Sequence, residues 1–101
     1  MIQFLDTNNT PLPPLQRIYS PAGSLTTVPV RFECRDGYFL WCTAPVGTTV
    51  EVLPDGESIW HDLLDSELDL ASFVGMHDFE LRVSNDAGTD DIVLTISETE
   101  P

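Results

Sequence analysis

The sequence predicts a single all-β domain, a sandwich of about seven or eight short antiparallel strands. Three observations support this fold class. Apolar and polar residues alternate in several short runs, which is the period of a half-buried strand. Prolines and glycines separate these runs at intervals of about 8–12 residues. A length of 101 residues with 42% hydrophobic residues suits one domain with one modest core.

Residues 1–25 are expected to form an N-terminal arm and the first edge strands of this domain. The stretch "MIQFL" alternates as a short strand does, and "RIYS" reads as a short edge strand. Three prolines in "DTNNTPLPPLQ" exclude a helix or a central strand. We expect the extended arm, residues 1–14, to add a strand to the sheet edge of a neighbouring subunit. Its expected contact residues are Ile2, Phe4 and Leu12.

Residues 26–97 are expected to form the sandwich, and residues 98–101 a frayed tail. The first convincing strand is "TVPVRFEC", and the Asp-Gly pair in "RDGY" predicts a hairpin into "YFLWCTA". The residues of the first strand that share one face are Val28, Val30, Phe32 and Cys34.

That hairpin has a simplest register, in which Phe32 lies opposite Trp41 and Cys34 lies opposite Phe39. Cys42 then points to the other face, so the two cysteines cannot bridge. A chain without an export signal also favours buried thiols over a disulfide. Both cysteines are therefore expected to be small core residues.

The later strands follow the same alternation. "PVGTTVEVLPDGESIW" places Val50 and Val52 on one face. "WHDLLDSELDLASFVG" mixes helical and strand spacing, so we expect an irregular connection or one helical turn near 61–66, then a short strand at 67–71. The last strands are "FELRVSN" and "TDDIVLTI", joined by "NDAG". Their inward residues are predicted to be Phe79, Leu81, Val83, Ile92, Leu94 and Ile96.

The formal charge is −13, and it is unevenly distributed along the chain. Residues 1–54 hold four acidic and three basic residues, whereas residues 55–101 hold thirteen acidic residues and one arginine. Such a chain is repelled by nucleic acid and by anionic membranes. The acidic residues are either a solvated face that maintains solubility or a face that meets a basic partner.

The N-terminus has no basic segment followed by a long apolar run, and no stretch approaches the roughly 20 apolar residues of a membrane span. We therefore expect a soluble chain that is not exported by a signal of its own.

Motifs of catalysis are absent from the sequence, which has no GxSxG, no phosphate-binding glycine-rich loop, no HExxH and no CxxC. His61 and His77 each precede an aspartate, but neighbouring residues of a strand point to opposite faces. The histidines and cysteines match no familiar zinc spacing. We expect no enzymatic activity and no cofactor.

Calcium is the metal that the sequence favours most. The candidate ligands are Asp86, Asp90 and Asp91, near the turn between the last two strands, and "DTNN" at 6–9 offers a second group. Asp and Asn also populate turns for backbone reasons, and the Asp-x-Asn-x-Asp-Gly spacing is absent.

Most aromatic residues are predicted to face the core. Trp60 differs, because it follows the "PDGES" turn near a sheet edge. It is expected either to stack on a sugar or anchor a protein interface, or to be buried under the 61–66 connection. The aromatic residues predicted to face the core are Phe32, Phe39, Trp41 and Phe79.

The stretch "FELRVSNDAG" resembles the F strand and F–G turn of I-set immunoglobulin domains, whose pattern is Tyr-x-Cys-x-Ala-x-Asn-x-x-Gly. Phe79, Leu81 and Val83 stand at the tyrosine, cysteine and alanine positions. Asn85 and Gly88 match the pattern. The stretch also resembles PKD domains, which favour Val-x-Asn-x-x-Gly at this place without a cysteine.

This resemblance covers residues 68–96, and Trp41 extends it, since immunoglobulin domains bury a tryptophan on the C strand. Leu81 excludes the usual disulfide, and Phe79 lacks the hydroxyl of the tyrosine corner. The resemblance implies an immunoglobulin-like sandwich without a disulfide. Domains of this kind are adhesive or decorating modules in bacterial surface proteins and in tailed-phage virion proteins.

These observations lead us to expect a non-enzymatic structural and binding module that decorates a larger assembly. Its most concrete form is a bacteriophage capsid decoration or tail accessory protein, assembled in the host cytoplasm and located in the virion. The expected partner is a shell or tail protein with a basic surface, and homo-oligomers are compatible with this role. The alternative is a glycan- or cell-surface-binding module, with or without calcium, whose site includes Trp60 or the acidic turn.

Overall fold

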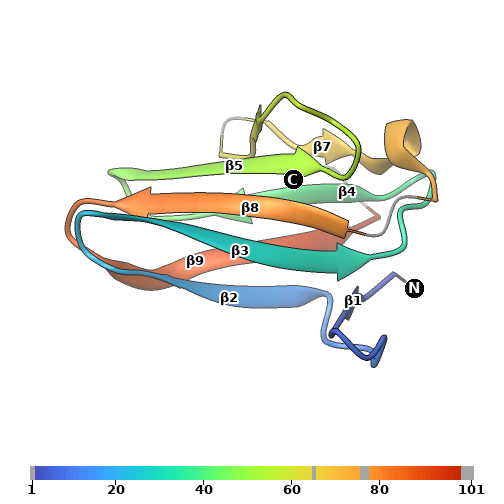
Figure 1. The fold of residues 1–101 in the computed structure, drawn as a ribbon, viewed down its shortest axis with the longest axis horizontal. Helices are drawn as coiled ribbons and strands as arrows, with labels where there is room; N and C mark the ends of the chain where they lie inside the picture. Colours follow the sequence, from blue (N-terminus) through green and yellow to red (C-terminus); the bar gives the residue numbers. More distant parts are fainter. Residues whose placement is uncertain (1, 65, 76–77, 99–101) are drawn as a thin grey trace.

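The computed structural model describes residues 2–64, 66–75 and 78–98, and it confirms the all-β class. Two antiparallel sheets make up the fold (Figure 1). The five-stranded sheet has the order β1 (Phe4–Leu5), β3 (Ser24–Phe32), β8 (Asp78–Asn85), β5 (Thr48–Pro54) and β6 (His61–Asp62). The four-stranded sheet has the order β2 (Leu15–Ser20), β9 (Thr89–Ser97), β4 (Phe39–Thr43) and β7 (Leu68–Asp69).

The segment with mixed spacing forms β6, then β7, then a single 3₁₀ turn, η1 (Leu70–Phe73). Asp69 caps η1 by accepting a hydrogen bond from the Ala71 amide at 2.9 Å. The expected strand at 67–71 is therefore shorter than predicted, and the helical turn lies after it. In the described ranges, no helix has the length and apolar character that crossing a membrane requires.

The core lies between the inner faces of the two sheets. Phe32 and Phe79 stack there with ring centroids 4.8 Å apart, and Phe4 meets Phe32 edge-on at 5.5 Å. The predicted alternation of the later strands is confirmed, because every predicted inward residue of β5, β8 and β9 is buried. These residues are Val50, Val52, Phe79, Leu81, Val83, Ile92, Leu94 and Ile96.

The predicted hairpin between "TVPVRFEC" and "YFLWCTA" is wrong. The strands that these stretches form, β3 and β4, lie in different sheets, so the turn around Asp36 crosses from one layer to the other. Val28 pairs with Leu81 in β8, and Trp41 pairs with Thr95 in β9. An Asp-Gly turn reverses the chain, but it does not require the two strands to share a sheet.

The inward face of β4 also differs from the prediction. Leu40 and Cys42 are buried, whereas Phe39 and Trp41 point outward and are partly exposed. The stretch "FLWC" is apolar on both faces, so alternation alone does not indicate which face is inside.

The last two strands are not a hairpin within one sheet either. β8 pairs with β3 and β5, and β9 pairs with β2 and β4, so the turn at 86–88 also joins the two layers. The F–G hairpin that the immunoglobulin resemblance implies is therefore corrected to a turn between sheets.

The N-terminal segment folds onto its own domain. Ile2 and Phe4 are buried, and β1 pairs with β3 through Phe4 and Phe32. The Leu12 amide donates to the Phe4 carbonyl at 2.7 Å, so residues 4–12 form a small hairpin. The expectation that Ile2 and Phe4 contact a neighbouring subunit is corrected, because burial in their own core is the nearest way to remove them from water.

Candidate interaction surfaces

The calcium candidates near the β8–β9 turn do not form a metal site. Asp86, Asp90 and Asp91 are all exposed. Asp91 instead forms an ion pair with Arg17, at 3.3 Å between Oδ1 and Nη1. Within the ranges that the structure describes, no group of three or more His, Cys, Asp or Glu side chains is placed to hold a metal ion.

The "DTNN" segment is a turn stabilised by its own aspartate. Asp6 Oδ1 accepts hydrogen bonds from the amides of Asn8 and Thr10, both at 2.8 Å. Asn9 has a left-handed backbone with φ of 62°, which asparagine tolerates well. The backbone interpretation of this segment is therefore favoured over a calcium site.

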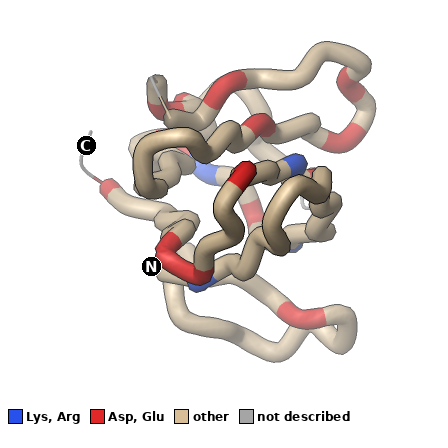
Figure 2. The backbone as a smooth tube through the Cα atoms, turned by 90° about the vertical axis from the view of Figure 1, so that its left-hand side faces the viewer, with Lys and Arg blue, Asp and Glu red and all other residues tan. Residues whose placement is uncertain are grey.

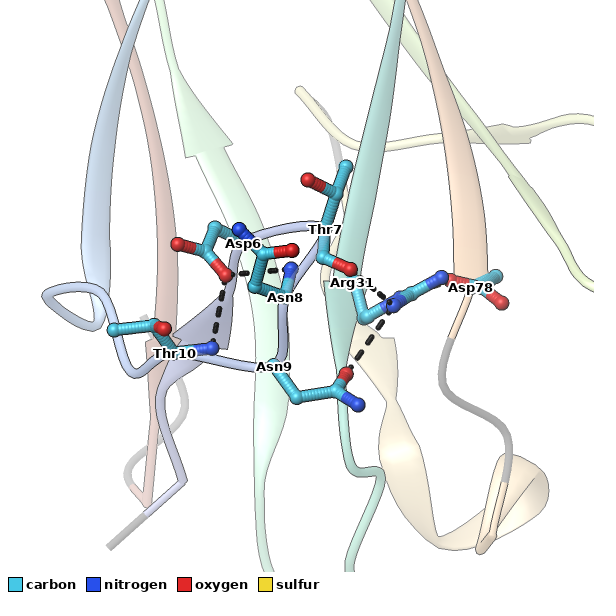
Figure 3. A network of polar contacts seen from close by, with 7 residues as sticks. All are labelled: Asp6, Thr7, Asn8, Asn9, Thr10, Arg31 and Asp78. Carbon is cyan, nitrogen blue, oxygen red and sulfur yellow. Dashed lines mark hydrogen bonds and ion pairs between the residues drawn. The ribbon is translucent and has the colours of Figure 1, made fainter.

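An arginine holds this turn against the five-stranded sheet (Figure 3). Arg31 on β3 donates from Nη1 to Asn9 Oδ1 at 3.2 Å and to the Thr7 carbonyl at 3.5 Å. Its Nε donates to Asp78 Oδ1 on β8 at 2.8 Å. This network fixes the N-terminal hairpin on the sheet.

Trp60 directly precedes β6 and is partly buried. The guanidinium of Arg82 lies 4.1 Å from the centroid of its ring. Arg82 also forms an ion pair with Glu51, at 2.8 Å between Nη2 and Oε1. One face of the indole is therefore covered by an arginine, which leaves a sugar only the other face.

The described histidine, His61, bonds to Glu57 at 2.9 Å between Nε2 and Oε1 and does not pair with the neighbouring Asp62. The other histidine, His77, lies outside the described residues.

Charge is spread over the molecule. Figure 2 shows acidic residues on several sides of the backbone, not gathered into one patch. Each of the four arginines of the chain forms an ion pair with a carboxylate. Because the chain has seventeen acidic residues, most of the negative charge has no arginine beside it.

One end of the sandwich is tied together by Asn85, which is buried. Its side chain donates to Thr48 Oγ1 at 2.6 Å and accepts from the Ala87 amide at 2.9 Å. Its backbone carbonyl accepts from the Gly23 amide at 3.1 Å. These bonds hold the β2–β3, β4–β5 and β8–β9 turns in one arrangement, at the left of Figure 1.

The same end, which we call the Asn85 end, exposes three large apolar side chains. Val46 at the tip of the β4–β5 turn is fully exposed, and Tyr19 and Leu25 are 64% and 62% exposed. The exposure of these three residues was not predicted from the sequence. Val46 stands between a proline and a glycine, a signal for an exposed turn, and Tyr19 alternates with buried Ile18.

A second apolar surface lies on the outer face of β4. Phe39 and Trp41 are partly exposed there, and Trp41 Nε1 donates to Ser97 Oγ at 2.8 Å. The bond fixes the orientation of the indole.

The cysteines are unpaired thiols in the core, as the sequence predicted. Burial raises the pKa of Cys34 and of Cys42 from 9.0 to about 12 in each case. Such thiols remain protonated at neutral pH, which makes them poor nucleophiles and poor metal ligands.

No protein-family model, curated protein or solved structure matches the chain. The fold defines a class of protein, the two-sheet all-β domains, whose functions depend on their surfaces rather than on the fold itself.

Proposed function

We propose that this chain is a non-enzymatic structural and binding module that attaches to a larger protein assembly. Its most concrete form is a capsid decoration or tail accessory protein in the virion of a tailed bacteriophage. The observation that carries the proposal is the Asn85 end, where Val46 on the β4–β5 turn, Tyr19 near the end of β2 and Leu25 near the start of β3 are exposed beside turns that Asn85 holds in place. Apolar side chains on a fixed backbone bind with little ordering cost.

The charge of the chain supports a partner with a basic surface. A formal charge of −13 attracts such a surface over long distances and speeds its encounter with the domain. The same charge disfavours nucleic acid and anionic membranes.

The test is co-sedimentation of the purified chain with high-molecular-weight particles from its source. Val46→Asp and Leu25→Asp are each expected to weaken the association at least about tenfold, because a carboxylate replaces the apolar contact. The matched control is Ile59→Asp, since Ile59 is 71% exposed but lies in the β5–β6 connection. Equal association of all three variants, or no association of the wild-type chain, contradicts the proposal.

A second candidate function, glycan binding, is favoured by the aromatic surface of β4. Phe39 and Trp41 are partly exposed side by side with threonine and serine hydroxyls of β9, a combination suited to sugars. Oligosaccharide titrations followed by tryptophan fluorescence test it. Quenching that is lost in Trp41→Ala and kept in Trp60→Ala supports it, and quenching by no sugar opposes it.

A further inference from the structure

We propose that the open edge of β2 is a site where an extended segment of a partner protein adds as a further strand, with a carboxylate opposite Arg17. This inference rests on the proposed binding function, and it names the attachment edge and the chemistry of the segment that pairs with it.

The edge strands of the two sheets differ in length. The outermost strands β1, β6 and β7 have two residues each, whereas β2 has six. Very short edge strands protect a sheet from unwanted pairing. Residues 24–30 of β3 also form an open edge, because β1 pairs only with the end of β3. Pro29 interrupts this edge and has no amide hydrogen to donate. Within the described residues, β2 is thus the long edge without a proline.

The backbone of β2 points half of its polar groups away from the sheet. The Ile96 amide donates to the Pro14 carbonyl at 2.9 Å, which sets the alternation of the β2–β9 ladder. By that alternation the N–H and C=O groups of Leu15 and Arg17 point away from β9. In the described part of the chain, no other backbone group bonds to them. The N–H and C=O groups of Leu15 and Arg17 are therefore available to an added strand.

The side chains on the outer face of β2 specify what such a strand must carry. Leu15 and Tyr19 are 51% and 64% exposed and lie on either side of Arg17. The ion pair of Arg17 with Asp91 is itself exposed, so it is weak and leaves Arg17 able to bind another carboxylate. Favourable cross-strand pairs then require an added strand with a central acidic residue and an apolar residue two positions before and two positions after it.

The space between β2 and β3 receives the other side chains of the added strand. A groove of about 140 Å³ lies there. Two of the four arginines of the chain line it, and none of its described lining residues is acidic, although the chain has seventeen acidic residues. Its apolar lining consists of Phe4, Leu5, Leu12, Ile18, Val28, Pro29 and Val30. Apolar inward residues and an acidic outward residue complement this site.

A second copy of the chain complements this edge poorly. Antiparallel pairing of two β2 strands centred on Arg17 sets the two Arg17 side chains directly opposite each other, which is destabilising. Two chains with a formal charge of −13 each also repel one another. The charges therefore favour a different protein as the occupant.

The test uses the full chain, labelled with ¹⁵N, and a capped peptide, Thr-Val-Val-Glu-Val-Val-Thr, with a counterpart that carries Lys at the centre. We expect the Glu peptide to shift the amide signals of residues 15–19 and to slow hydrogen exchange at Leu15 and Arg17. Its affinity is expected to exceed that of the Lys peptide at least about tenfold. Arg17→Glu should reverse this preference.

Two further variants probe the backbone edge and its flanking side chains. Arg17→Pro removes an N–H that points away from β9, so it blocks the added strand without removing a bond to β9. Leu15→Thr keeps the backbone groups and removes the apolar contact of Leu15 with the added strand. It serves as the test if the Arg17→Pro protein does not fold. The control for Leu15→Thr is Ile59→Thr, an exposed apolar residue outside β2.

The inference is overturned by equal binding of the two peptides, by amide shifts confined to residues outside β2, or by equal effects of Leu15→Thr and Ile59→Thr on peptide binding. Self-association of the free chain that Leu15→Thr abolishes also overturns the inference, because a second copy is then the occupant.

The proposed function can fail separately from the β2 site. If particles bind the chain but Leu15→Thr has no effect, only the β2 site is wrong. If the peptide binds β2 but no particle contains the chain, only the proposed assembly is wrong.

Discussion

At the scale of single residues, Asn85 does the most to arrange the proposed binding end. It is a buried asparagine at one end of the sandwich, and its side chain reaches Thr48, far away in the sequence. The pattern Val-x-Asn-x-x-Gly drew attention to this residue in the sequence. Its partner was not predictable, because the contact depends on β5 and β8 lying side by side.

Asn85→Ala should lower the free energy of unfolding by about 2–3 kcal/mol, because the Thr48 hydroxyl and the Ala87 amide lose their buried partner. Urea denaturation measures the change. Ser84→Ala, which removes an exposed hydrogen bond to Thr49, is the control and should cost less than about 1 kcal/mol. Equal losses for the two variants would contradict the role of Asn85.

The two cysteines should not react with thiol reagents in the folded protein. Because burial raises the pKa of Cys34 and Cys42 from 9.0 to about 12, both thiols stay almost fully protonated at pH 8. We expect a thiol reagent to modify them only after denaturation.

The same shift has a consequence for stability. A raised pKa stabilises the folded state at pH values below 9.0, and this contribution is lost as the pH rises through about 12. Unfolding curves recorded between these values should show decreasing stability, and Cys42→Ala should reduce the slope. A slope that this substitution leaves unchanged would contradict the assignment.

At the scale of elements, β8 and β4 show what alternation does and does not determine. In β8 the outward residues are polar, so the buried face was predictable. In β4 both faces are apolar, and the prediction chose the wrong one. Sheet membership was not predictable for either strand, since a short turn can stay in one sheet or cross to the other.

The N-terminal strand should be needed for stability. Phe4→Ala removes a buried ring that packs on Phe32, and we expect a loss of about 3–5 kcal/mol. Leu15→Ala, at a half-exposed position, should cost less than about 1 kcal/mol. Thermal or urea unfolding distinguishes the two. A Phe4→Ala protein as stable as the control would restore the expectation of a detachable arm.

Two turn glycines, Gly88 and Gly47, allow a controlled comparison of the same substitution. Gly88 and Gly47 both have a positive φ, of 77° and 89°, which costs other residues about 1 kcal/mol or more. A Cβ at Gly88 would lie 3.0 Å from the Ala22 amide nitrogen, whereas one at Gly47 meets nothing within 4 Å. Gly88→Ala should therefore destabilise the protein more than Gly47→Ala in urea unfolding. The reverse order would contradict the close packing of the turns.

At the scale of the whole molecule, the sequence predicted the two-layer β class and most core positions, but not the surfaces. Tyr19, Leu25 and Val46 belong to three segments of the chain, and only the fold brings them to one end. The acidic residues were expected as one face, and the fold distributes them over several sides (Figure 2).

The net charge should make stability depend on salt. With a formal charge of −13 and only four exposed or partly exposed arginine pairs, repulsion outweighs attraction. Raising sodium chloride from about 0.01 M to about 0.3 M shortens the screening length severalfold, so Tm should rise. Thermal unfolding measures Tm at each salt concentration. A Tm that falls with salt would mean that the ion pairs contribute more than the charge repulsion.

We propose that the chain is a built-in component of a larger assembly. Quantitative mass spectrometry of washed high-molecular-weight particles from its source tests this most directly, by counting copies of the chain against the main shell or tube protein. We expect a fixed ratio that survives washing. Absence of the chain from every particle would contradict the claim and would favour the glycan-binding alternative.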